Sequence, residues 1–161
     1  MYQNAKLVER SKVVTGLAPI TPSTSTPDYV SLKNVNRMTA IITVDNGTVV
    51  TGSAITLKQA SAVANTGEKA LAFAYVHANT DTGAGDTLTE TAVTSNTFTT
   101  DTTNNKNLMY VIDVDPATLD VANGFDCVRV GTGDAANCVA SVVYILDMKY
   151  QKATPPATIT D

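Results

Sequence analysis

The stretch RMTAIITVDNG at residues 37–47 decides the fold class. Between positions 37 and 44 the side chains alternate with a period of two, which is typical of a β-strand with one buried face. One face consists of Met38, Ala40, Ile42 and Val44, and the other of Arg37, Thr39, Ile41 and Thr43. The Asn-Gly pair that follows accepts positive φ, so the sequence predicts a hairpin with residues 48–57 as the returning strand.

Short alternating segments of this kind recur along the chain. Further strands are predicted at 69–77, at two places within 87–100, and at 108–114, 125–130 and 139–150. The 69–77 segment sets Leu71, Phe73 and Tyr75 against small residues, which indicates burial on both sides. No stretch of helical period is long enough to cover a parallel sheet. We therefore expect an all-β, antiparallel β-sandwich of jelly-roll-like type, with a barrel left as the alternative.

Proline and threonine set the expected domain boundaries. Residues 5–15 have a mixed pattern that fits a strand or a short helix, and Pro19, Pro22 and Pro27 follow among Ser and Thr. Such a segment does not continue a helix or a central strand, so residues 1–28 are predicted to be an extended N-terminal arm. Residues 29–150 form the β-sandwich domain, and residues 151–161, with Pro155-Pro156, form an extended C-terminal tail or second arm.

Composition narrows the range of functions. A chain of 161 residues is long enough for one domain with a proper core. Only 16% of residues are charged and the net charge is -4, so no basic field attracts nucleic acid. About one residue in six is threonine, which favours extended backbone. Nothing approaches the roughly 18 apolar residues of a membrane span, and the start does not resemble a signal peptide, so we expect folding in a cytosol and no membrane partner.

His77 is the only imidazole and hence the one candidate general base. It lies beside a loop with Asp81 and Asp86, and Ser and Thr hydroxyls are plentiful, which would permit a Ser-His-Asp arrangement. No G-x-S-x-G elbow positions such a nucleophile, however. An ordinary hydrogen-bonded residue at a strand end is the better interpretation, and we expect no enzymatic activity.

Two groups of carboxylates are candidate sites, one for binding calcium and one for acid/base catalysis. Asn79, Asp81 and Asp86 place oxygen atoms near glycines, as calcium loops do, but Glu90 lies beyond the spacing that such a loop requires. A solvent-exposed turn with Asx hydrogen bonds is the simpler interpretation. Asp113 and Asp115 share a strand face, as paired acid/base carboxylates would. Without an aromatic-lined cleft they are better interpreted as solubilising charges at a strand end.

Cys127 and Cys138 lie at either end of a predicted hairpin, a placement that would let them face each other as a disulfide. In a chain without an export signal two cysteines are more often free thiols, and the sequence leaves both options open. They lack C-x-x-C spacing, and no G-x-x-x-x-G-K phosphate loop occurs. The sequence thus predicts no catalytic, cofactor-binding or metal-binding residue, and no cofactor.

An ordered series of phrases carries a family resemblance. A Pro/Thr arm leads into YVSLKN at 29–34, and further phrases follow at intervals up to residue 150. They are ITLKQA at 55–60, GEKALAF at 67–73, DTLT at 86–89, NTF at 96–98, YVI at 110–112 and YIL at 144–146. Over residues 29–150 the chain resembles small virion proteins of tailed bacteriophages that decorate or cement the capsid.

The resemblance implies a non-enzymatic subunit that binds the outside of an assembled capsid and stabilises it. Its expected partner is the major capsid protein, and it is expected to form a homo-oligomer, a dimer or trimer, on the shell. It would be made in the host cytoplasm and located on the capsid surface of the virion. The family has no active-site residues to carry over. Two proline-containing arms agree with this role, because they can lie across neighbouring subunits at little ordering cost.

Two other functions remain as alternatives. The first is a phage tail, neck or host-adhesion subunit, since β-sandwiches serve there too. The second, less favoured, is a carbohydrate-binding module. Sugar sites generally need exposed aromatic platforms, whereas this chain has no Trp. Tyr75, Tyr110 and Tyr144 alternate with apolar neighbours, which predicts core-facing or half-buried rings.

Overall fold

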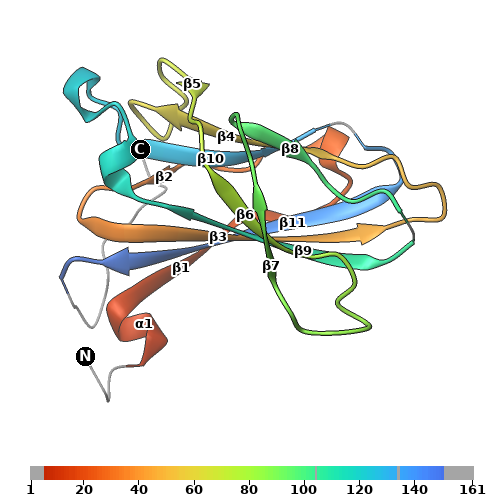
Figure 1. The fold of residues 1–161 in the computed structure, drawn as a ribbon. Coiled ribbons are helices and arrows are strands. Elements are labelled where there is room, and N and C mark those ends of the chain that lie inside the picture. Colours follow the sequence, from red (N-terminus) through yellow and green to blue (C-terminus); the bar gives the residue numbers. More distant parts are fainter. Residues whose placement is uncertain (1–5, 104, 134, 151–161) are drawn as a thin grey trace.

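The computed structural model describes residues 6–150 except 104 and 134, and these residues form an antiparallel β-sandwich (Figure 1). The predicted all-β fold class is confirmed. A six-stranded sheet has the order β1-β11-β3-β9-β6-β7, and a five-stranded sheet has the order β2-β10-β4-β5 with β8 also paired to β4. No helix in the described part of the chain is long enough to span a bilayer. The predicted tail at 151–161 lies outside the described residues.

The strands of the two sheets differ widely in length, from two residues in β2 to twelve in β3. The six-stranded sheet comprises β1 (Ser11–Ile20), β3 (Val35–Asn46), β6 (Tyr75–Asn79), β7 (Thr89–Ala92), β9 (Asn107–Val114) and β11 (Cys138–Met148). The five-stranded sheet comprises β2 (Val30–Ser31), β4 (Ala54–Ala60), β5 (Lys69–Ala70), β8 (Thr97–Thr99) and β10 (Cys127–Thr132). The helices are α1 (Leu7–Arg10) and three 3-10 turns, η1 (Pro22–Thr24), η2 (Pro116–Thr118) and η3 (Val121–Asn123).

The core lies between the two sheets and follows the predicted alternation of β3. Its inward residues Met38, Ala40, Ile42 and Val44 are all at most 2% exposed. They face a layer from the other sheet that includes Ile55, Leu57, Val128 and Val130. Apolar burial of this kind supplies most of the driving force for a sandwich of two antiparallel sheets.

The predicted hairpin between residues 37–44 and 48–57 is wrong. β3 pairs with β11 on one edge and with β9 on the other, so neither edge is free for β4. Asn46 continues the strand opposite Cys138, and Gly47 does not take positive φ. The chain instead crosses to the five-stranded sheet, where β4 pairs with β10.

The N-terminal arm also needs correction. Residues 11–20 are extended, as predicted, but they form the edge strand β1 of the six-stranded sheet and pair with β11. Val14 and Leu17 are 7% and 5% exposed, so they belong to the core. The register shifts around Gly16 and again before Ile20, so the proline-containing end of the strand stays paired with β11, at Ile20 and Ala140, in an irregular ladder. The sandwich therefore begins near residue 11, before the predicted boundary at 29.

The predicted strand at 69–77 is divided between the sheets. β5 lies in the five-stranded sheet and β6 in the six-stranded sheet, and residues 71–74 cross between them. The crossing leaves Tyr75 54% exposed, so its predicted burial is wrong, whereas Tyr110 and Tyr144 are buried as expected. Likewise β10 and β11 lie in different sheets, so Cys127 and Cys138 do not bracket a hairpin.

The Tyr144 side chain, near the centre of β11, connects the two sheets through a hydrogen bond. Its ring is fully buried, its hydroxyl accepts a hydrogen bond from the Val130 amide at 3.0 Å, and it donates to the Asp28 carbonyl at 3.2 Å. The ring lies against Gly16, where any Cβ would overlap it. β1 can thus approach β11 closely because position 16 has no side chain.

Replacing Gly16 with Ala should lower the free energy of unfolding by roughly 1–3 kcal/mol, because the new methyl group displaces a ring held by two hydrogen bonds. Urea unfolding followed by circular dichroism measures the change. Gly85→Ala is the matched control, since nothing lies within 4 Å of a Cβ at that position. Equal stability of the two variants would contradict the close approach of β1 to Tyr144.

Candidate functional site: an apolar trough on the six-stranded sheet

The outward face of the six-stranded sheet carries apolar side chains at its centre. Cross-strand register places Val143 beside Ile41, Ile41 beside Val111, and Val13 beside Ile145. These residues face away from the core, and all are partly or largely exposed, with Val13 46% exposed. The trough floor is defined here as Val13, Ile41, Met109, Val111, Val143 and Ile145, from four adjacent strands.

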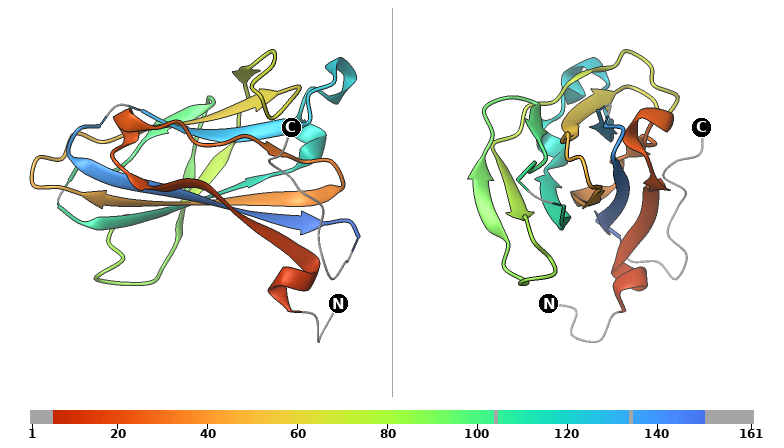
Figure 2. Two further views of the ribbon diagram at one scale, coloured as in Figure 1. Left: turned by 180° about the vertical axis from the view of Figure 1, so that it is seen from behind. Right: turned by 90° about the vertical axis from the view of Figure 1, so that its right-hand side faces the viewer.

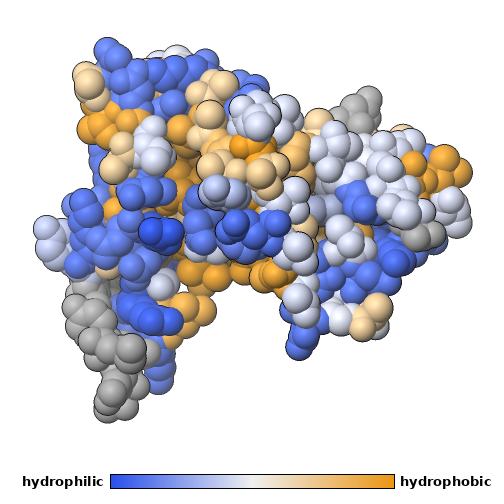
Figure 3. All heavy atoms as spheres, in the orientation of Figure 1, coloured by the Kyte–Doolittle hydropathy of each residue, from blue (hydrophilic) through white to orange (hydrophobic). Residues whose placement is uncertain are grey.

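Two projections border this floor. α1 and the loop between β6 and β7 both extend from the outward side of the six-stranded sheet, away from the five-stranded sheet (Figures 1 and 2). The space-filling view shows a hollow between them with hydrophobic residues along it (Figure 3). Towards Thr82 and Val139 the surface deepens into a cavity of about 420 Å³ that Pro19 also lines. The floor and its two borders together are called the trough.

Charged residues surround the trough floor. Asp45, Asp113 and Asp147 occupy exposed outward positions on β3, β9 and β11, and Glu90 occupies one on β7. At outward positions of the strands the cationic or titratable groups are Arg37 and His77, and the border element α1 adds Lys6 and Arg10. The Thr39 hydroxyl donates a hydrogen bond of 2.5 Å to Asp113. The rim is therefore acidic around an apolar centre.

The structure places His77 on this rim. Its Nε2 lies 3.5 Å from Glu90 Oε2, and both side chains are largely exposed, at 42% and 57%. His77 and Glu90 are opposite each other in the register of β6 and β7, so an ordinary cross-strand pair explains their contact. In the described part of the chain the polar contact of His77 is with this carboxylate and not with a hydroxyl nucleophile.

The candidate calcium loop is stabilised by its own hydrogen bonds. Asn79 Oδ1 accepts from the Asp81 amide at 2.9 Å, an Asx turn, and Asn79 Nδ2 donates to the Gly85 carbonyl at 2.8 Å. Lys106 Nζ lies 2.7 Å from Asp81, and its hydrogen bond lowers the pKa of that carboxyl. Asp86 is exposed and Glu90 pairs with His77, so the structure does not bring these oxygen atoms together. Among the described residues no three His, Cys, Asp or Glu side chains cluster as metal ligands would.

Asp113 and Asp115 also have structural partners. Asp113 accepts the hydrogen bond from Thr39, and Asp115 Oδ1 accepts one from the Ala117 amide at 2.9 Å, which caps η2. Asp115 is thus the N-cap residue of this 3-10 turn. Both carboxylates are exposed, in agreement with their interpretation as strand-end charges.

The two cysteines are free thiols in separate layers. Cys127 is 2% exposed and its Sγ donates to Asp126 Oδ1 at 3.1 Å, whereas Cys138 is 6% exposed and its Sγ lies 3.8 Å from the Ala135 carbonyl. Burial, with the Asp126 hydrogen bond second, raises the pKa of Cys127 to about 12. Burial also raises the pKa of Cys138. Both thiols are thus in the unreactive protonated form at neutral pH.

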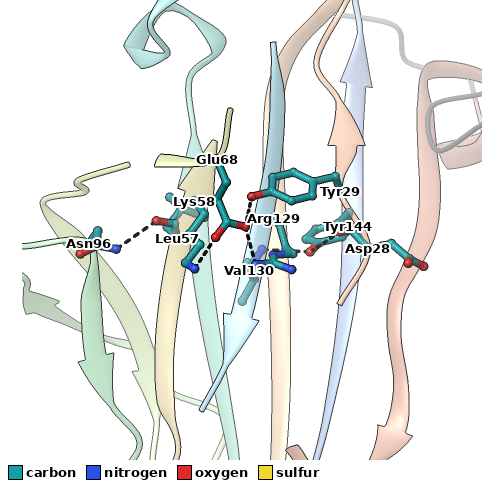
Figure 4. Close-up of polar contacts among 9 residues, drawn as sticks. All are labelled: Asp28, Tyr29, Leu57, Lys58, Glu68, Asn96, Arg129, Val130 and Tyr144. Carbon is teal, nitrogen blue, oxygen red and sulfur yellow. Dashed lines mark hydrogen bonds and ion pairs between the residues drawn. The ribbon is translucent and has the colours of Figure 1, made fainter. Parts of the chain in front are cut away.

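A polar cluster that the sequence analysis missed covers the outer face of the five-stranded sheet (Figure 4). Glu68 accepts hydrogen bonds from Tyr29 Oη at 2.6 Å, Arg129 Nη2 at 2.6 Å and Lys58 Nζ at 2.5 Å. Arg129 also stacks over the Tyr29 ring, with Cζ 4.9 Å from its centroid. The four residues come from distant segments, so no local motif in the sequence indicates the cluster.

The Glu68 cluster has a structural role. Burial alone would raise the pKa of Glu68, but hydrogen bonds from Lys58 and Tyr29 and the Arg129 charge outweigh it and hold the pKa below its usual value. Burial and the Glu68 hydrogen bond raise the pKa of Tyr29. With its charges paired internally, this outer face contrasts with the apolar trough on the other sheet.

Comparison with known proteins gives one structural similarity. No family model matches the chain, and no curated protein matches it. The fold is similar to that in the crystal structure of the SPBc2 prophage-derived protein YomS, at 15% sequence identity and a TM-score of 0.46. The similarity covers 84% of this chain and 92% of that protein.

The raised thiol pKa values predict that the native protein resists thiol reagents. At pH 8 both cysteines should react with 5,5′-dithiobis(2-nitrobenzoate) at least 100-fold more slowly than in guanidinium chloride, where the unfolded chain should release two equivalents. Absorbance of the released thiolate measures both rates. Rapid labelling of the native protein would contradict the buried placement of Cys127 and Cys138.

Replacing Glu68 with Gln should cost about 2 kcal/mol of stability at pH 7, because it removes charged hydrogen bonds to Lys58 and Arg129. Since the folded-state pKa of Glu68 is lowered, the loss is full above the ordinary glutamate pKa of about 4.3 and disappears as pH falls through the lowered value. Urea unfolding across pH 3–7 measures it. Glu90→Gln, on an exposed pair, is the control and should have almost no effect.

Proposed function

We propose that this protein is a non-enzymatic structural subunit of a virion that binds the outside of a phage capsid and stabilises it. The observation that carries the proposal is the trough. Its apolar floor spans four adjacent strands, and the described residues leave it uncovered. Contiguous apolar surfaces on soluble domains typically mark contacts with other macromolecules, since covering them removes apolar area from water.

The polar residues support an assembly role over a chemical one. Of the side chains that the sequence singled out as candidates for chemistry, four contact a partner in a turn, a cap or a cross-strand pair: His77, Asp81, Asp113 and Asp115. A group engaged in this way contributes to stability, and general acid–base work would require a substrate within reach of the same atoms. The proposed activity is therefore binding.

The sequence phrases between residues 29 and 150 support the type of particle. They resemble capsid decoration proteins, whose partner is the major capsid protein. A small domain present in many copies on a shell gains retention through avidity, so each contact can be modest. An oligomer on the capsid surface would use the trough as an assembly contact. The alternative, a tail, neck or adhesion subunit, would use the same surface to form rings or tubes.

Co-sedimentation with capsids that lack their accessory subunits tests this proposal. The wild-type chain should sediment with the capsids and add density at symmetry positions in cryo-electron maps. Ile41→Lys, which puts a charge at the centre of the trough floor, should reduce the bound fraction at least tenfold. Val49→Lys is the matched control, because Val49 is a 61% exposed apolar residue outside the trough.

Two results would count against the proposal. If wild-type protein stays in the supernatant at every concentration, capsid binding is ruled out for that shell. If the pure protein then forms rings or tubes in negative-stain images, the tail or neck function replaces it. Equal binding by Ile41→Lys and wild type would show that the trough is not the assembly contact.

A further inference from the structure

α1 is a single helical turn that has no buried residue. Leu7 is 45% exposed and Val8 is 61% exposed, although both are apolar. The Lys6 amide donates to Glu9 Oε2 at 3.0 Å, which closes the first turn. One helical turn gains little stability in water by itself, because nucleation is unfavourable. Its two apolar side chains are therefore available for contact with another surface.

The trough and α1 lie on the same side of the molecule. α1 directly precedes β1, the strand that contributes Val13 to the floor, and it projects beyond the outward face of the sheet (Figures 1 and 2). One face thus carries both a raised apolar element and an apolar hollow. A surface with both features is self-complementary under two-fold symmetry, which is the requirement of an isologous dimer.

We propose that α1 of one copy packs into the trough of a second copy, and that the second copy's α1 packs into the trough of the first. Leu7 and Val8 would contact the floor around Ile41, Val111 and Val143. This inference goes beyond the proposed function, since the contact is between copies of this chain and needs no capsid. In the dimer both troughs are filled, so a capsid would contact other surfaces of the two copies, and these surfaces would act together.

Charge complementarity favours a second copy as the occupant. Lys6 and Arg10 flank the apolar pair of α1, while the Glu9 carboxylate accepts a hydrogen bond from the Lys6 backbone amide. The trough rim has the opposite sign, with four carboxylates against Arg37 and His77. The rim carboxylates are Asp45, Asp113, Asp147 and Glu90. A chain of net charge -4 repels its own copies in most orientations, and this orientation places its basic corner against its acidic rim.

Light scattering after size exclusion tests the contact with the full-length chain and no capsid present. The wild-type protein at about 100 μM, a concentration well above a micromolar dissociation constant, should have twice the chain mass of 16.9 kDa. Val8→Glu, in the helix, and Ile41→Lys, in the trough, should each raise the dissociation constant at least tenfold. Val49→Lys should remain dimeric, and a native circular dichroism spectrum would show that each variant is folded.

Mixing the two interface variants gives the decisive result. The Val8→Glu copy keeps an intact trough, and the Ile41→Lys copy keeps an intact α1, so an equimolar mixture can form one of the two contacts. Sedimentation velocity should detect dimers in the mixture at a concentration at which each variant alone is monomeric. Damage to folding would not be repaired by mixing, so this outcome is specific to a helix-in-trough contact.

A monomeric wild-type protein would overturn the inference, as would a dimer that neither variant weakens or a mixture that fails to associate. The capsid assay separates this inference from the proposed function. If the capsid itself occupies the trough, Val8→Glu should bind capsids normally while Ile41→Lys does not. If a second copy occupies it, both variants should lose the avidity of the dimer.

Discussion

The pairing of β3 on both of its edges is the constraint on which the rest of the structure depends. Its twelve residues run between β11 and β9, and its inward side chains form the centre of the core. Because backbone donors and acceptors must be paired when buried, a strand saturated on both edges cannot also form a hairpin with the next segment. The chain therefore crosses between the layers after Asn46, and the same happens at residues 71–74 and between β10 and β11.

This arrangement gives the two sheets different outer surfaces. On the five-stranded sheet, Glu68 gathers Tyr29, Lys58 and Arg129 into a closed polar cluster over the strands. On the six-stranded sheet, the outward positions in the middle of the central strands are Val, Ile, Met, Thr and Ser, and the charged outward residues lie towards the strand ends, with no such cluster over the middle in the described chain. The outer face of the five-stranded sheet therefore has its charges paired within the domain, whereas the outer face of the six-stranded sheet is suited to association with another molecule. Both proposals depend on this difference.

The position of α1 links local structure to assembly. A turn with exposed Leu7 and Val8 adds nothing to the core, yet its basic residues and the acidic rim have opposite signs on one face. Closed two-fold contact would satisfy both features at once and would cover the trough before or during binding to a shell. The same surface in an open, head-to-tail arrangement would produce rings or tubes in place of a dimer.

The sequence by itself determined the fold class, the positions of most strands and the inward face of β3, because a period of two is a local property of the backbone. It also indicated the exposed roles of Asp113 and Asp115. Which strands pair was decided only in the tertiary structure, since β4 has the same alternation whether it lies beside β3 or in the other sheet. The sequence did not predict β1 as a strand of the sandwich, because the prolines at its end and beyond it indicated an extended arm. The trough was hidden as well: Ile41 is one apolar residue on an otherwise polar face until non-local pairing places Val111 and Val143 beside it.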